Sequence, residues 1–344
     1  MYSKTLLGNI LELHRGYDLP ERERIEGNVP VISSSGYSGM HNQYKCDGEN
    51  VITGRYGTIG EVFFHYGKCW PLNTALYVSD FKGNVPKYIY YLLKYALKMS
   101  IDGKDKSTVP GVDRNVLHKM NIPFCHDIDE QKKIIRVLEL IDKKIEVNNM
   151  INDNLQHMAY TKYMHMFYGK KSNGKLGDII VEQPKSPIQV GEAKEASGTV
   201  PFFTSGEAIL KWPEALATGR NCFLNTGGNA DVKFYVGESA YSTDTWCISA
   251  KNDMADYLYL LLDSIKLELN LKFFQGTGLK HLQKPLLRDR PIYIPSGAEL
   301  REFNLEVKPW LSMISDNIRE SEELISLRDW LLPMLMNGQA NIQG

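Results

Sequence analysis

The chain has 344 residues, 43% hydrophobic and 24% charged, which is ordinary globular usage and at this length favours two domains. Its formal net charge is −1, so no global positive field attracts nucleic acid, and any DNA-binding surface must be local or completed by partners. No stretch reaches the ~18 apolar residues of a membrane span and the N-terminus lacks a secretory pattern, so we expect a cytoplasmic protein without membrane association. Five cysteines without a Cys-x-x-Cys pair predict neither a disulfide framework nor a zinc site.

The sequence repeats itself over almost its whole length, which predicts two copies of one structural unit. The Leu-Gly pair at Leu7 returns at Leu176, 169 residues later, and GNVP at Gly27 is echoed by GTVP at Gly198, 171 residues later. A helical pattern follows in each half, after Val85 and after Met254, and then a glycine-containing loop and an apolar run ending at proline. The order of features is therefore the same in both halves.

The run VITGRYGTIGEV, beginning at Val51, interrupts a strand-like pattern with three glycines around Arg55 and Tyr56. Glycine allows a tight loop or a close backbone approach, which in a DNA reader brings main chain near phosphates and presents Arg55 to a guanine edge or a phosphate. The alternative is a β-hairpin turn with its arginine on the solvated surface. The second half has Thr226-Gly227-Gly228-Asn229 in this region and lacks the arginine.

Each half closes in a long helical pattern, which we place at 127–168 and 298–337. About forty residues at ~1.5 Å each give a rod of roughly 60 Å, suited to packing against its repeat copy. We expect Asp129 to cap the first helix and Pro309 to kink or delay the second. The expected apolar stripes comprise Ile134, Leu138, Ile141, Ile145, Ile151, Leu155 and Met158 in the first helix, and Phe303, Val307, Trp310, Ile314, Leu324, Leu327 and Leu331 in the second.

Asn148 lies on the first stripe. It is either a polar residue that sets the register of the helices or a tolerated defect in their interface.

The chain resembles the specificity subunit of type I restriction-modification systems. The residues that carry the resemblance are the run Gly54-Arg55-Tyr56-Gly57-Thr58-Ile59-Gly60, Trp70-Pro71-Leu72-Asn73-Thr74, Ile122-Pro123 and Glu130-Gln131-Lys132-Lys133-Ile134. The resemblance implies a mixed α/β (α+β) fold with two repeated target recognition domains, 1–126 and 169–297, held apart by two helices that pair as an antiparallel coiled coil.

The same resemblance implies the function and the partners. Each domain is expected to read one half of a split double-stranded DNA site, while the helices set the gap and dock two modification (methyltransferase) subunits. S-adenosylmethionine would be bound by those subunits, and no cofactor by this chain; restriction (translocase or nuclease) subunits are left open. The alternative is a coiled-coil scaffold or decoy that binds the modification subunits without recognising DNA.

Loops rich in hydroxyl, amide and basic side chains occupy corresponding places in the two halves, and such groups donate to phosphates and base edges. Ordinary surface turns have the same composition, so the alternative stays open. The candidate DNA-binding residues are Ser34, Ser35, Tyr37, Arg55, Tyr56, Lys104, Lys106 and Thr108 in the first half, and Thr204, Ser205, Asn229, Lys272, Gln275, Thr277 and Lys280 in the second.

A catalytic function is not expected. The sequence contains no Gly-x-x-x-x-Gly-Lys-Ser/Thr phosphate loop, no Asn-Pro-Pro-aromatic or Asp-Pro-Pro-Tyr methyltransferase motif, and no clustered histidines. Two Glu-x-Lys triplets, at Glu130 and Glu192, match a nuclease metal signature, but we interpret the first as an acidic helix start and the second as a solvated loop. We therefore predict a non-catalytic subunit without a metal site.

Overall fold

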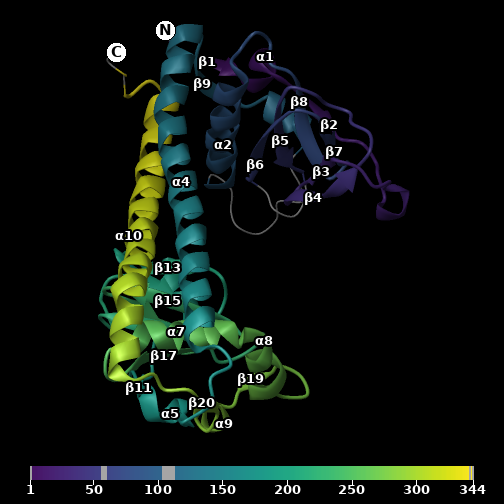
Figure 1. The fold of residues 1–344 in the computed structure, drawn as a ribbon. Helices are drawn as coiled ribbons and strands as arrows, with labels where there is room; N and C mark the ends of the chain where they lie inside the picture. The colour runs from purple at the N-terminus through teal and green to yellow at the C-terminus, as the bar shows by residue number, and fades with distance from the viewer. Residues whose placement is uncertain (1, 56–59, 103–112, 341, 343–344) are drawn as a thin grey trace. The chain divides into compact units, whose positions relative to one another are not determined.

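The computed structural model describes residues 2–55, 60–102, 113–340 and 342 (Figure 1). These residues form two compact units. The first unit is Met1–Lys144 together with Glu323–Gly344, and the second is Ile145–Glu322. Each unit thus takes part of both long helices, α4 (Ile128–Phe167) and α10 (Gly297–Met336).

The first unit combines a four-stranded sheet in the order β2-β8-β5-β6 with a three-stranded sheet in the order β4-β3-β7 and a β1-β9 ribbon. Pairing is antiparallel except between β3 and β7. Helix α2 packs on β5 and β6. The elements are β1 (Tyr2–Leu6), α1 (Leu7–Ile10), β2 (Glu12–Arg15), η1 (Glu21–Glu23), β3 (Val29–Ser33), β4 (Gly36–His41), β5 (Glu49–Gly54), β6 (Val62–Tyr66), β7 (Trp70–Pro71), β8 (Ala75–Asp80), α2 (Pro86–Asp102), α3 (Arg114–His118) and β9 (Asn121–Cys125).

The second unit has a four-stranded sheet in the order β11-β17-β14-β15, a three-stranded sheet in the order β13-β12-β16, and the ribbons β10-β20 and β18-β19. The elements are β10 (Gly174–Lys175), α5 (Leu176–Ile179), β11 (Ile180–Glu182), α6 (Val190–Glu195), β12 (Val200–Phe203), β13 (Ile209–Trp212), β14 (Arg220–Asn225), β15 (Val232–Val236), β16 (Ala240–Tyr241), β17 (Thr245–Ala250), α7 (Ala255–Ser264), α8 (Lys266–Glu268), η2 (Leu269–Phe273), β18 (Phe274–Gln275), β19 (His281–Leu282), α9 (Lys284–Arg288) and β20 (Pro291–Ile292).

The two units are copies of one fold, as the repeat predicts. The strand orders β2-β8-β5-β6 and β11-β17-β14-β15 correspond strand for strand, and so do β4-β3-β7 and β13-β12-β16. Helix α4 begins at Ile128 and α10 at Gly297, 169 residues later, and both have 40 residues. The mixed α/β class and the two long helices are confirmed.

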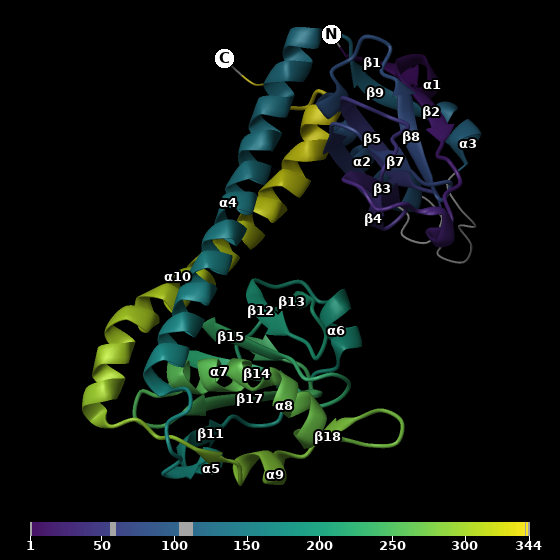
Figure 2. The same ribbon diagram turned by 45° about the vertical axis from the view of Figure 1, so that its right-hand side comes forward.

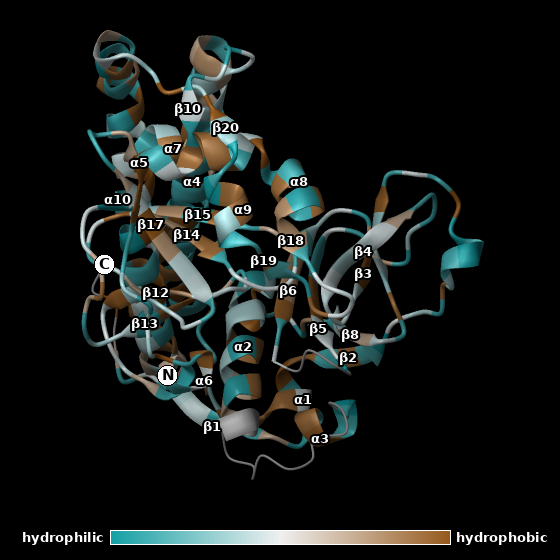
Figure 3. Ribbon diagram, turned by 90° about the horizontal axis from the view of Figure 1, so that it is seen from below, coloured by the Kyte–Doolittle hydropathy of each residue, from teal (hydrophilic) through white to brown (hydrophobic). Residues whose placement is uncertain are grey.

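The hydrophobic core of each unit is completed by the far end of the other repeat's helix. The core of the first unit contains Leu332, Leu335 and Met336 from the end of α10. The core of the second contains Ala159, Tyr163 and Phe167 from the end of α4, packed with α7. Helix α7 is buried along most of its length and is drawn largely brown in Figure 3. Neither repeat can therefore bury its own core alone.

Within each unit, a segment of α4 lies beside a segment of α10 (Figures 1 and 2). In the second unit Lys162 pairs with Glu306 over 2.8 Å, and Asn152 accepts from Asn317 over 2.8 Å. In the first, Arg328 pairs with Asp142 over 2.9 Å. As the position on α4 falls from 162 to 142, its partner on α10 rises from 306 to 328, so the helices run antiparallel, as expected.

A polar layer interrupts this helix interface in the second unit. The amide of Asn148, which is fully buried, donates to Glu320 over 2.8 Å and to Ser321 Oγ over 3.2 Å. Asn148 and Asn317 are 169 residues apart, as are Asn152 and Ser321, so the two hydrogen-bonded pairs are repeat copies of one another. Asn148 is thus a partner in a repeated polar contact between the helices, the arrangement expected of a register-setting residue.

The apolar stripe of α4 differs from the predicted one in this region. Ile151 and Met158 are 37% and 46% exposed, whereas Asn148 and Ala159 are fully buried. The buried face of α4 therefore includes a polar residue, Asn148, and does not include Ile151 or Met158. A stripe defined by apolar residues alone does not describe this face correctly.

The helix ends correct two expectations. Asp127, rather than Asp129, caps α4: its carboxylate accepts from the amides of Asp129 and Glu130 over 2.9 and 3.2 Å, and these bonds lower the pKa of Asp127. Pro309 does not delay the second helix, which begins at Gly297 and continues through the proline to Met336. Pro309 removes one backbone hydrogen bond, which the surrounding packing tolerates.

Glu299 closes a capping box at the start of α10. Its carboxylate accepts from the Ser296 amide over 2.8 Å and pairs with Lys170, beyond the end of α4, over 2.5 Å. The Lys170 ammonium, followed by the Ser296 donors, lowers the pKa of Glu299 to about 2. Folding therefore favours the ionised form of Glu299.

We expect Glu299→Gln to destabilise the protein at neutral pH and to lose its effect in acid. Because folding depresses the pKa of Glu299 from 4.5 to about 2, its contribution is present above pH 4.5 and disappears as the pH falls toward 2. Urea unfolding midpoints of wild type and variant across this range measure the difference. The exposed Glu302 on the same helix, changed to Gln, serves as control. A Glu299 effect that does not vary with pH would contradict the assignment.

Candidate nucleic-acid interface

In the first unit, three loops meet at the ends of β3, β5 and β7. The Arg55 amide donates to the Thr74 carbonyl oxygen over 2.9 Å, and the Ser34 amide donates to Thr74 Oγ1 over 3.4 Å. Ser34 and Arg55 are half-buried, and Ser35 next to them is exposed. The structure thus brings Ser34 and Arg55, two predicted residues 21 positions apart, together at Thr74.

The second unit builds the same backbone arrangement from different residues. The Thr226 amide donates to the Asp244 carbonyl oxygen over 2.9 Å, as Arg55 does to Thr74. Likewise the Ser242 amide donates to the Phe203 carbonyl oxygen over 3.0 Å, as the Leu72 amide does to the Ile32 carbonyl oxygen over 2.8 Å in the first unit. Thr226 is therefore the structural counterpart of Arg55.

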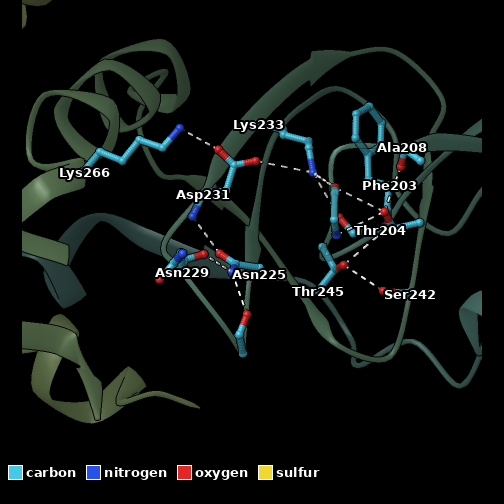
Figure 4. A network of polar contacts seen from close by, with 12 residues as sticks. Phe203, Thr204, Ala208, Asn225, Asn229, Asp231, Lys233, Ser242, Thr245 and Lys266 are labelled. Atoms are coloured by element: carbon cyan, nitrogen blue, oxygen red, sulfur yellow. Dashed lines mark hydrogen bonds and ion pairs between the residues drawn. The ribbon is translucent and has the colours of Figure 1, made fainter. Parts of the chain in front are cut away.

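Asn225 shapes the glycine loop that follows β14. This buried side chain donates to the carbonyl oxygens of Gly227, over 2.7 Å, and Asn229, and its Oδ1 accepts from the Asp231 amide over 2.7 Å (Figure 4). Three backbone groups that would otherwise be unpaired are satisfied by one amide. The loop is consequently held in one conformation, with the Asn229 side chain exposed at its tip.

Charged side chains link this loop to the loop after β12. Asp231 pairs with Lys266 over 2.6 Å and with Lys233 over 3.5 Å, and Lys233 donates to the carbonyl oxygens of Thr204 and Gly206 (Figure 4). Burial by itself would raise the pKa of Asp231, but Lys266 and Lys233 outweigh it and lower that pKa. The ion pairs thus keep Asp231 ionised and fix Lys233 between the two loops.

The β18-β19 hairpin joins the same region of the second unit. The Gly228 amide donates to the Lys280 carbonyl oxygen, and the Leu282 amide to that of Thr226, both over 2.9 Å. The hairpin tip, from Gln275 to Lys280, is exposed. The candidates Gln275, Thr277 and Lys280 therefore lie on a hairpin anchored to the loop that carries Asn229.

The remaining candidates have varied surroundings. Tyr37 is 65% exposed and its hydroxyl contacts His65 Nδ1 over 3.1 Å. Thr204 is buried, and its hydroxyl donates to the Ala208 carbonyl oxygen within its own loop over 2.8 Å. Ser205 beside it is half-buried, and Lys272 is exposed and pairs with Glu268 over 3.3 Å. The candidates that lie outside the described residues are Tyr56, Lys104, Lys106 and Thr108.

Sequence reasoning missed the residues that hold these loops together. Thr74 and Lys233 each bond to two loop segments and Asn225 bonds three residues of its own loop, yet none of the three lies in a hydroxyl-rich or basic run. Asn225 carried a usable signal, because an asparagine at the end of a strand and directly before glycines is well suited to satisfying a loop backbone. Thr74 ends the run Trp70-Pro71-Leu72-Asn73-Thr74, but nothing in that run indicates that it bonds two other loops, and nothing local to the sequence singles out Lys233.

The arrangement suits recognition rather than catalysis. Exposed amides, hydroxyls and lysines on fixed loops can donate to phosphates and base edges. Within the described part of the chain, no group of three or more histidine, cysteine, aspartate or glutamate side chains is placed to hold a metal ion. No helix among the described residues is long and apolar enough to cross a membrane.

Comparison with known proteins points to one class. Residues 3–157 match the family described as type I restriction modification DNA specificity domain. The type I restriction enzyme MjaIX specificity subunit of Methanocaldococcus jannaschii is 24% identical over 310 residues, covering 76% of this chain and 70% of that protein. The putative type I specificity subunit S.MpnORF638P of Mycoplasma pneumoniae is 22% identical over 373 residues, covering 97% and 96%.

A solved structure has a similar fold. The crystal structure of the type I restriction-modification system S subunit from M. genitalium matches with a TM-score of 0.66 over 97% of this chain and 96% of that one, at 16% identity. The chain thus shares the fold of that S subunit. The chain is thus similar to type I restriction-modification specificity subunits, through the family match over residues 3–157 and through relatives of 22–24% identity.

We expect Asn225→Ala to loosen the glycine loop of the second unit. The change leaves two carbonyl oxygens and one amide without their partner, at a cost of about 1–3 kcal/mol for an unsatisfied buried group. Hydrogen exchange of the Asp231 amide should accelerate accordingly. Asn229→Ala is the matched control, because only the backbone of Asn229 takes part in the network. Equal protection of Asp231 in Asn225→Ala and wild type would contradict this role.

Proposed function

We propose that this chain is a specificity subunit and that it reads a bipartite double-stranded DNA target, one half with each unit, through the loops that meet at Thr74 and at Thr226. The observation that carries the proposal is the repetition of one backbone scaffold with different side chains. Arg55 and Thr226 occupy equivalent positions, held by equivalent amide-to-carbonyl hydrogen bonds of 2.9 Å. Two readers with the same frame and different side chains suit a target whose halves differ in sequence.

The side chains favour different chemistry in the two halves. An arginine can form a bidentate pair with guanine O6 and N7, which makes Arg55 the base reader of the first unit in this proposal. In the second unit, Asn229, Gln275 and Lys280 are exposed donors on anchored loops. Buried Thr204 shapes its loop instead of touching DNA. Tyr56, Lys104, Lys106 and Thr108 remain predicted contacts of the first half.

The net charge of −1 indicates that partners complete the DNA-binding surface. Neutralising phosphates supplies much of the affinity for DNA, and this chain has 41 acidic side chains against 40 of lysine and arginine. We infer that two modification subunits dock on α4 and α10 and bind the S-adenosylmethionine, while 1–126 and 169–297 act as the recognition domains. The cytoplasm, where host DNA is methylated, is the proposed location.

Methylome sequencing tests the proposal. The chain is expressed with the methyltransferase encoded beside it in a host without other modification enzymes. A bipartite methylated motif with a fixed gap, absent when this chain is omitted, is the expected result. A stable complex without a new motif would instead support a scaffold or decoy that occupies modification subunits, which no observation made on this structure favours.

We expect Arg55→Ala to weaken or relax recognition of one half-site and to leave the other unchanged. Loss of a good bidentate base contact costs about 1–3 kcal/mol at that position. Motif analysis of the methylated sites measures the effect position by position. Thr226→Ala, at the equivalent place in the second unit, is the matched variant and should affect only the other half. A uniform loss at both halves after Arg55→Ala would contradict base reading.

We expect matched heptad insertions in both helices to lengthen the gap without changing the bases read. Seven residues add about 10.5 Å, roughly three base-pair steps of ~3.4 Å. Insertion between Asn148 and Asn152 in α4, and between Asn317 and Ser321 in α10, lets the helices extend together. The control inserts the heptad into α4 alone, which breaks the pairing and should abolish methylation. A changed half-site at constant gap would contradict a spacer role.

A further inference from the structure

Two cysteines of the first unit lie directly opposite one another on adjacent antiparallel backbone segments. The Cys46 amide donates to the Cys69 carbonyl oxygen over 3.1 Å, and the Cys69 amide donates to the Cys46 carbonyl oxygen over 2.9 Å. Residues that exchange both hydrogen bonds have Cα atoms about 5.5 Å apart, inside the ~4.4–6.8 Å range of disulfides. A bond between these thiols is therefore within reach.

The two thiols also differ in exposure. Cys46 is half-buried, while Cys69 is fully buried in a small core with Ile32, Ile52 and Tyr77. Hydrogen bonding between the thiols lowers the pKa of Cys46 and raises that of Cys69. The thiolate is the reactive form of cysteine, so Cys46 is suited to attack first and Cys69 to resolve the product.

The other cysteines do not form such a pair. Cys222 lies opposite Ile248, and Cys247 lies opposite Phe223, on neighbouring strands β14 and β17. Because side chains alternate between the faces of a sheet, these two thiols point to opposite faces, and they belong to different hydrophobic cores. Cys125 lies in the first unit's main core, where its thiol donates to the Asp127 carbonyl oxygen over 3.6 Å.

We propose that Cys46 and Cys69 form a reversible disulfide when the protein meets a peroxide. The Cys46 thiolate attacks one peroxide oxygen, so an S–O bond forms, the O–O bond breaks, and the released hydroxide becomes water. The Cys69 sulfur then attacks Cys46, so the S–S bond forms and the S–O bond breaks. The leaving hydroxide takes the Cys69 proton as a second water. The thiols together lose two electrons, and the peroxide gains them.

The disulfide would be easily reduced because the two backbone segments that carry Cys46 and Cys69 must move closer together to form it. Directly opposed residues have Cβ atoms about 4.5–5.5 Å apart, whereas a disulfide needs about 3.5–4.5 Å. The closure draws the two segments together by roughly 1 Å, and strained disulfides are the ones that ordinary thiol reductants open readily.

The movement of Cys69 toward Cys46 acts on the backbone segment that leads to Thr74. Strand β7 starts at Trp70, directly after Cys69, and runs into Leu72 and Thr74. Thr74 holds the amides of Ser34 and Arg55. Oxidation is therefore expected to displace the loop of the first unit and to weaken its half of DNA recognition, a consequence that rests on the proposed function.

The test uses the full chain in complex with its modification subunits, treated with hydrogen peroxide. Peptide mapping after alkylation should find a Cys46–Cys69 linkage that dithiothreitol removes. Methylation of the reduced complex's own target should fall about tenfold or more on oxidation, the loss expected of one good base contact, and recover on reduction. Cys46→Ser should make methylation insensitive to peroxide, and Cys69→Ala is a second such variant. Cys222→Ala, the control, should respond like wild type.

The outcomes separate the two proposals. Absence of the linkage in the folded complex overturns the disulfide, whatever the methylation shows. A linkage that forms without any change in methylation overturns its effect on recognition. A reduced complex that methylates no specific target counts against the proposed function alone, because peptide mapping does not depend on DNA.

Discussion

The interaction on which the rest of this structure depends is the reciprocal packing of the two long helices. The end of α4 supplies Ala159 and Phe167 to the core of the second unit, and the end of α10 supplies Leu332 and Met336 to that of the first. Apolar burial is the main favourable term in folding, so each repeat needs the other's helix to complete its core. The antiparallel course of the helices follows from this exchange.

The loops at Thr74 and Thr226 stand on a backbone frame that does not depend on the side chains proposed to read DNA. The same amide-to-carbonyl bonds fix Arg55 and Thr226, although one side chain is a charged guanidinium and the other a neutral hydroxyl. In the second unit a buried ion pair reinforces the frame: Arg220, at the start of β14, bonds Asp256 of α7 over 2.8 Å and Ser312 of α10 over 2.9 Å. Specificity can thus change while the fold persists.

The cysteine pair places a chemical sensor within this frame instead of on the reading surface. Cys69 directly precedes Trp70, over whose ring the Lys45 ammonium lies at 4.8 Å, and the segment that reaches Thr74. A small movement there is transmitted because the intervening backbone is hydrogen-bonded on both sides, to Tyr17 and to Ile32. The second unit has Ala217 and Ser239 at the corresponding bridge, so only one unit would respond.

The sequence by itself determined the repeat, the mixed α/β class and the two long helices, because their periodicity and order are written locally and twice. It also located the glycine loops, since strand patterns end there. Only the tertiary structure shows that the helix ends exchange between the two repeats and that Asp127 caps α4. It likewise decided that Thr74 and Asn225 hold the loops and that Cys46 meets Cys69. These features depend on contacts between residues far apart in the chain, and no local pattern encodes which distant groups come within hydrogen-bonding distance.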